Sequence, residues 1–121
     1  MPNTLRFIAG AGQDNTLRTV TQDASILPYA ATIAIVPVQQ QNLYQVAQLT
    51  GTATINATVT NLYIGDTVRF LFSADATARV VTFGTNFVSA GTLSVTASKA
   101  SHIDFIFNGT ALQEMGRATT A

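Results

Sequence analysis

The chain has 121 residues and a formal net charge of zero, and charged residues make up only 10% of it, against about 25% in an average soluble domain. Its length fits a single domain, and its few basic residues are scattered, which excludes the basic surface that a nucleic-acid binder needs. The absence of cysteine excludes disulfides and thiolate metal sites.

Residues 1–29 differ from the rest of the chain in their pattern of apolar and polar residues. Short apolar pieces at Leu5 to Ala9 and Leu17 to Val20 are separated by a Gly-containing polar segment and are followed by Pro28. This pattern favours extended segments and turns over a helix. We therefore predict two parts, an extended N-terminal arm over residues 1–29 and a β-rich body over residues 30–121.

The body is rich in Val, Ile, Thr and Phe in short runs, which predicts strands, and no long segment has helical periodicity. Residues 31–38 form the first predicted strand. Pro37 near its end favours an edge position or a strand terminus, because proline cannot donate to a sheet ladder. Residues 43–49 and 52–59 predict two more strands on either side of a Thr-Gly pair.

Residues 67–73 form the clearest predicted strand. Val68, Phe70 and Phe72 fall on one face of it and should point to the core, while the residues between them fall on the other face. A loop at residues 75–78 follows. We expect it to join this strand in a hairpin to a second strand at residues 79–83.

The last part of the chain predicts a short strand around Leu93 and a longer one over residues 103–107. Asn108-Gly109 comes next and is the strongest two-residue turn signal in the sequence, so we expect a hairpin with residues 111–115. Several short strands separated by turns are typical of an all-β fold. The prediction is an antiparallel β-sandwich or small barrel with the extended N-terminal arm.

Reactive side chains do not gather in any recognisable pattern. His102 and Asp104 lie two residues apart on one strand face, but no third ligand is spaced to join them, which favours a polar outer face over a metal or acid–base site. No serine stands in a Gly-x-Ser-x-Gly motif. We expect no enzyme activity, no catalytic residue, no metal and no cofactor.

The aromatic residues divide into two groups. Most phenylalanines fall in alternating runs, which is typical of core residues. Tyr29, Tyr44 and Tyr63 lie nearer to segment ends, where a ring can be buried while its hydroxyl stays in water, and we predict them as inter-subunit contacts. No apolar run approaches the ~18 residues of a membrane span, and the first residues given lack the basic start and long apolar run of a signal peptide, so we expect no membrane partner.

A series of turn and strand motifs covers just over half of the chain, from about Leu49 to Arg117. They are Leu49-Thr50-Gly51, Gly65-Asp66-Thr67-Val68, Asp75-Ala76-Thr77, Val81-Thr82-Phe83-Gly84-Thr85-Asn86-Phe87, Asp104-Phe105-Ile106-Phe107-Asn108-Gly109-Thr110 and Glu114 to Arg117. Together they resemble a small β-domain of bacteriophage virion structural proteins, including head decoration proteins and tail-fibre tips. Leu112 departs from the fibre versions, which carry a tryptophan or other aromatic residue after the Asn-Gly-Thr turn.

The resemblance implies a virion protein that is assembled in the host cytoplasm. Because the domain is preceded by a short arm and not by shaft repeats, we expect a capsid decoration (cement) protein that binds the outer surface of the head and stabilises contacts between capsomers. Its partners would be the major capsid protein and further copies of itself, in a homotrimer. The alternative is a tail-fibre or receptor-binding module that recognises host surface glycans.

The arm would then bind by adding a strand to an exposed sheet edge, with main-chain hydrogen bonds giving affinity without charges. The arm residues that we expect to contact the partner are Leu5, Phe7, Ile8, Leu17 and Val20.

Overall fold

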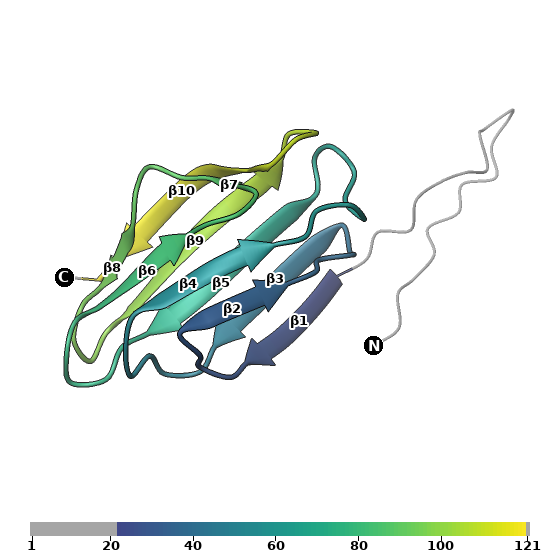
Figure 1. Cartoon of the computed structure of the whole chain (residues 1–121). Coiled ribbons are helices and arrows are strands. Elements are labelled where there is room, and N and C mark those ends of the chain that lie inside the picture. Colours follow the sequence, from purple (N-terminus) through teal and green to yellow (C-terminus); the bar gives the residue numbers. More distant parts are fainter. Residues whose placement is uncertain (1–21, 121) are drawn as a thin grey trace, which may run out of the picture.

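The structure, a computed structural model, describes residues 22–120. Within this range the chain forms ten strands and no helix, which confirms the prediction of an all-β fold (Figure 1). In chain order the strands are β1 (Gln22–Leu27), β2 (Thr32–Ile35), β3 (Gln41–Val46), β4 (Ala53–Ala57), β5 (Thr67–Ser73), β6 (Arg79–Phe83), β7 (Phe87–Val88), β8 (Leu93–Val95), β9 (Ala100–Phe107) and β10 (Leu112–Thr119).

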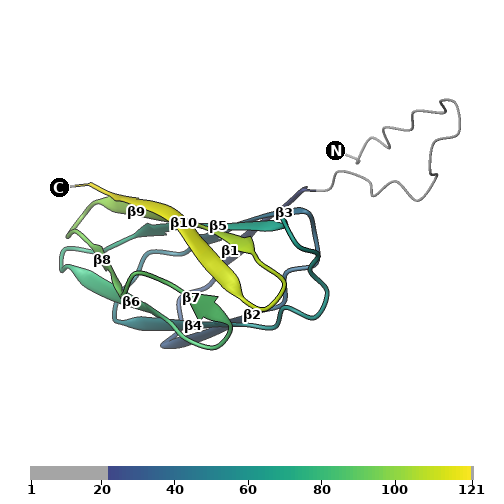
Figure 2. The same cartoon turned by 90° about the horizontal axis from the view of Figure 1, so that it is seen from above.

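The strands form two sheets that lie face to face as two layers (Figure 2). The larger sheet has the order β1-β3-β5-β9-β10-β7, and the smaller has the order β2-β4-β6-β8. Through the first six strands the chain alternates between the sheets, so β1, β3 and β5 pair in parallel, as do β2, β4 and β6. This is the winding of a β-solenoid, and the predicted antiparallel arrangement is wrong for these six strands.

The later strands pair mainly in the antiparallel sense. β9 lies antiparallel to both β5 and β10, and β8 lies antiparallel to β6. The β9–β10 pair confirms the hairpin predicted at Asn108-Gly109, where Gly109 has a φ of 100° that favours glycine. The other predicted hairpin is wrong, because β5 and β6 face one another across the core and lie in different sheets.

The core lies between the two layers and is largely aromatic. Val68, Phe70 and Phe72 on β5 are almost fully buried, as the alternation predicted. The ring of Phe70 lies at the centre of the aromatic cluster, with its centroid 5.6 Å from that of Tyr44 and 6.1 Å from that of Phe105. Such offset and edge-to-face pairs add about 0.5–1.5 kcal/mol each beyond the burial of apolar area.

The predicted arm, residues 1–29, is described only in its last part. Residues 22–27 form β1, which lies at the edge of the larger sheet in parallel register with β3. The predicted partner-binding residues lie outside the described residues; they are Leu5, Phe7, Ile8, Leu17 and Val20.

Candidate interaction surfaces

The first turn of the winding leaves a free strand edge in each sheet, since β1 ends the larger sheet and β2 ends the smaller one among the described strands (Figure 1). The backbone of β1 shows which groups are free. The N–H of Ala47 donates to the carbonyl oxygen of Leu27 at 2.7 Å, so alternate residues of β1 bond to β3. The backbone groups of Ala24 and Ile26 therefore point away from β3, and the Ile26 side chain is 73% exposed.

β2 also has alternate residues whose backbone groups face away from its neighbouring strand. The N–H of Thr58 donates to the carbonyl oxygen of Ile35 at 2.9 Å, so the backbone groups of Thr32 and Ala34 face away from β4. Pro37 follows the strand, as the sequence indicated. The two rows of free donors and acceptors lie on the same side of the molecule, and we call them together the open edge.

The opposite side of the molecule is protected. The edge strands β7 and β8 have two and three residues. β7 pairs with β10 only at Leu112 and Gln113, and the rest of β10, which also lies at this edge, carries a bulge between Glu114 and Gly116. In a regular strand, residues three apart point to opposite faces; the bulge shifts this alternation, so Glu114 and Arg117 meet on one side. Short edge strands, bulges and charges all oppose pairing with another sheet.

The Glu114–Arg117 pair also fastens the loop beside it. Arg117 Nε donates to Glu114 Oε2 at 2.7 Å, and Nη1 donates to the carbonyl oxygen of Thr92 at 2.7 Å. The other carboxylate oxygen of Glu114 accepts the Ala90 N–H at 2.7 Å. Hydrogen bonds from Arg117 hold the pKa of Glu114 below its ordinary value and raise the pKa of Arg117 itself.

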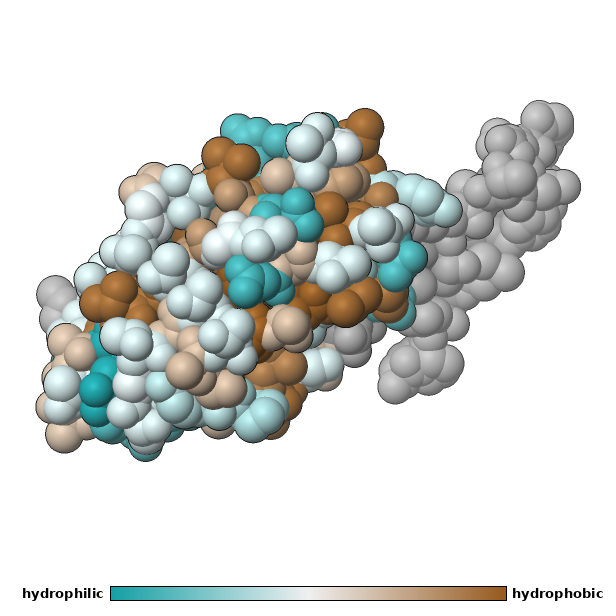
Figure 3. Space-filling view, viewed as in Figure 1, coloured by the Kyte–Doolittle hydropathy of each residue, from teal (hydrophilic) through white to brown (hydrophobic). Residues whose placement is uncertain are grey.

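A second exposed apolar surface lies on the loop between β4 and β5. The side chains of Tyr63 and Ile64 are 65% and 76% exposed. The buried carboxylate of Asp66 accepts the Tyr63 N–H at 2.8 Å, and Gly65 closes the turn with a φ of 97°. On the face of the body that Figure 3 shows, brown apolar patches lie among pale residues of intermediate hydropathy and several teal hydrophilic ones.

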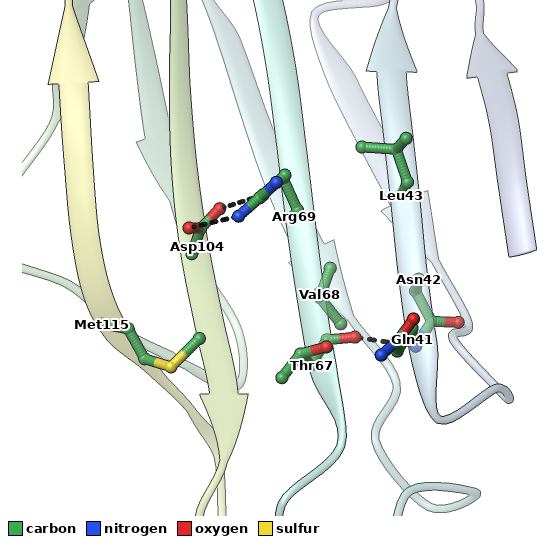
Figure 4. Close-up of a pocket in the computed structure, with 8 residues that line it drawn as sticks. All are labelled: Gln41, Asn42, Leu43, Thr67, Val68, Arg69, Asp104 and Met115. Carbon is green, nitrogen blue, oxygen red and sulfur yellow. Dashed lines mark hydrogen bonds and ion pairs between the residues drawn. The ribbon is translucent and has the colours of Figure 1, made fainter. Parts of the chain in front are cut away.

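The outer face of the larger sheet carries a shallow groove of about 270 Å³ beside the pair Arg69–Asp104 (Figure 4). Arg69 Nε donates to Asp104 Oδ1 at 2.7 Å, and Nη2 donates to Oδ2 at 3.0 Å. Asp104 raises the pKa of Arg69, mainly through these hydrogen bonds. Both carboxylate oxygens of Asp104 thus accept a hydrogen bond from Arg69.

The three predicted inter-subunit tyrosines have different surroundings. Tyr29 is half-buried, and its hydroxyl donates to the carbonyl oxygen of Thr52 at 2.8 Å. Tyr44 lies inside the core beside Phe70, because its position on β3 faces the smaller sheet, so its ring has no free surface to offer. Tyr63 presents its ring to solvent.

The sequence reasoning did not find the open edge. Its only local signals were the prolines that follow β1 and β2, Pro28 and Pro37, and the lack of charged residues from Ala24 to Val38. In the part of the chain that the structure describes, no three His, Asp or Glu side chains gather as a metal site, and no helix could cross a membrane. Comparison with protein-family models finds no match, and a search of curated proteins finds none with significant similarity.

Proposed function

We propose that this protein decorates the outer surface of a bacteriophage capsid and stabilises the contacts between coat-protein capsomers. The observation that carries the proposal is the open edge of β1 and β2. A strand of another chain can pair there through main-chain hydrogen bonds, and this mode of binding needs neither charges nor a reactive site. The resemblance of the turn motifs to virion proteins supplies the setting.

The composition supports a protein that works as a contact surface. Charged residues are few and the net charge is zero, so copies packed side by side repel one another little. The partners in this proposal are the major capsid protein and further copies of the chain, with the trimer that the resemblance implies. We interpret the two layers as the predicted sandwich, wound in its first half as a solenoid.

A second candidate function is that of a tail-fibre or receptor-binding module. The exposed ring of Tyr63, on a turn held by Asp66, favours this alternative because aromatic rings on exposed loops can pack against the apolar faces of sugars. The exposed Ile64 beside it would extend such a contact.

The decisive experiment measures binding of the purified chain to capsids that lack a decoration protein and, in parallel, to host cells. Saturable capsid binding that raises the temperature of particle rupture supports the decoration role. Absence of capsid binding would contradict the decoration role. Cell binding that disappears in Tyr63→Ala, without any effect on particles, transfers the assignment to the receptor-binding alternative.

A matched variant tests the arm. Deletion of residues 1–21 keeps every described strand, including β1, so the body should stay folded by circular dichroism. If the arm binds the capsid as predicted, this variant should lose capsid binding. Unchanged binding would show that residues 22–120 carry the contact.

A further inference from the structure

We propose that two copies of this chain associate through their open edges, with β1 of one protomer antiparallel to β1 of its partner about a two-fold axis at Ala24. This inference concerns self-association of the free protein at the same edge that the proposed capsid role uses. Its test reads the oligomeric state of the free chain, whereas the test of the capsid role reads binding to particles, so the two can fail separately.

The backbone of β1 sets the register of such a pair. The outward-facing backbone groups belong to alternate residues, Gln22, Ala24 and Ile26. A two-fold axis midway between the two copies of Ala24 places these residues opposite each other. It also pairs residue 22 of each protomer with Ile26 of the other. Each outward-facing donor and acceptor of β1 that has no strand partner among the described residues then meets one, and the two Ala24 Cα atoms lie about 5.5 Å apart.

The second free edge explains why the partner is another copy. β2 ends the smaller sheet on the same side of the molecule as β1 (Figure 1). A two-fold axis normal to the sheets carries β2 of one protomer toward β2 of its partner while it pairs the two β1 strands. A single extended peptide would cover one edge strand and leave the other without a partner. A second copy, in contrast, presents its own β1 and β2 edges, which are spaced as in the first copy.

The side chains along the open edge do not oppose this association. From Ala24 to Val38 the chain has no charged residue, and neither β1 nor β2 contains a bulge or an internal proline. The outward side chain at the axis is the small methyl group of Ala24, and the exposed Ile26 gains an apolar contact on pairing. Apart from Asp23 on β1, the devices that keep edges apart are thus missing from β1 and β2.

The opposite edge explains why the pairing is two-fold and not three-fold. A ring of three copies needs a head-to-tail contact, in which the open edge of one copy meets the opposite edge of the next. Among the described strands, that edge has the short strands β7 and β8 and the part of β10 beyond Gln113, which β7 does not reach and which carries the bulge and the Glu114–Arg117 pair. Edge pairing therefore predicts a dimer, and a trimer would have to form through other surfaces.

A charge-swap experiment on the full-length chain tests the axis. In Ala24→Lys two like charges face each other across the axis, and the same holds in Ala24→Glu, so each variant alone should dimerise up to about fivefold more weakly than the unchanged chain. An equimolar mixture of the two should recover dimers of one copy each, detected by native mass spectrometry and sedimentation velocity. Ala118→Lys, at an exposed alanine on β10, is the control and should dimerise normally.

Cysteine cross-linking gives a second readout that does not depend on charge. The chain has no cysteine, so Ala24→Cys provides a single thiol, and a Cα separation of about 5.5 Å lies within the range of a disulfide. Mild oxidation should convert Ala24→Cys to a covalent dimer and leave Ala118→Cys largely monomeric. A monomer at every concentration, a trimer unaffected by the Ala24 variants, or equal cross-linking of both thiols would overturn the inference.

Discussion

Replacing Arg117 with alanine should destabilise the protein much more than replacing Arg69, although both guanidinium groups hold a carboxylate by two hydrogen bonds. The two pairs have nearly the same geometry, with shortest N–O distances of 2.7 Å in each. They differ in exposure, because 58% of the Arg69 side chain is accessible but only 25% of the Arg117 side chain. The comparison therefore contrasts an exposed ion pair with a more buried one whose arginine also donates to two backbone carbonyl oxygens.

The magnitudes follow from the partners that each substitution leaves behind. Arg117→Ala removes two bonds to Glu114 and two more to the carbonyl oxygens of Gly91 and Thr92. Hydrogen bonds to charged groups contribute about 1.5–3 kcal/mol, and discounting for the water that still reaches this pair gives an expected loss of about 2–3 kcal/mol. For Arg69→Ala, an exposed pair predicts about 0–1 kcal/mol.

Urea denaturation of both variants, followed by circular dichroism, measures the two losses directly. For a domain of this size the thermal midpoint should fall by about 10–20 °C in Arg117→Ala and by less than about 8 °C in Arg69→Ala. Arg117→Lys should lie between, because an ammonium group cannot replace the fork of the guanidinium. Equal losses at the two sites would refute the reasoning that burial and the two carbonyl hydrogen bonds of Arg117 decide the difference.

Acid should weaken the same site: because Arg117 holds the pKa of Glu114 below its ordinary value of 4.5, the stabilisation is fully present above that pH and is lost as the pH falls through the lowered pKa. Urea midpoints measured from about pH 6 to about pH 2 should therefore fall, and should fall less in Arg117→Ala. Phe70→Ala should lower the free energy of unfolding by about 3–5 kcal/mol because it leaves a cavity among packed rings, and a loss below about 1 kcal/mol in urea would contradict the central place of this ring. Gly65→Ala should destabilise by about 1 kcal/mol, because the positive φ disfavours a side chain even though the space is open, and Gly65→Asn should lower the thermal midpoint less.

Local features of the fold were predictable from the sequence because they depend on neighbouring residues alone. The alternation from Val68 to Phe72 and from Ile103 to Phe107 predicted which side chains are buried. The Asn108-Gly109 turn predicted the β9–β10 hairpin. In each case a period of two residues or a positive φ carries the information.

The pairing of strands was not predictable in the same way. An apolar stripe on β5 followed by one on β6 looks the same whether the strands lie side by side or face each other across a core. The parallel strands of the larger sheet begin at residues 22, 41 and 67, and this unequal spacing hides the repeat that would have indicated a solenoid. Only the long-range register distinguishes the two arrangements.

The candidate surfaces depended on the same missing information. Tyr44 belongs to the core because its side chain on β3 faces the smaller sheet, an arrangement that its sequence context did not indicate. The Glu114–Arg117 pair needs the bulge between Glu114 and Gly116, which no local pattern marks. The open edge exists because β1 and β2 begin the winding, so it too is a property of the topology.

The two edges of this fold therefore have different consequences for the protein. A solenoid buries each turn against its neighbours, so its first and last turns need a cap or a partner. The last turn is covered by the antiparallel strands and fastened by Arg117, whereas no described strand covers β1. Any chain that pairs with β1 adds hydrogen bonds to the folded state alone and must stabilise it. Binding at the open edge and resistance to unfolding are thus linked, whether the partner is a second copy or a coat protein.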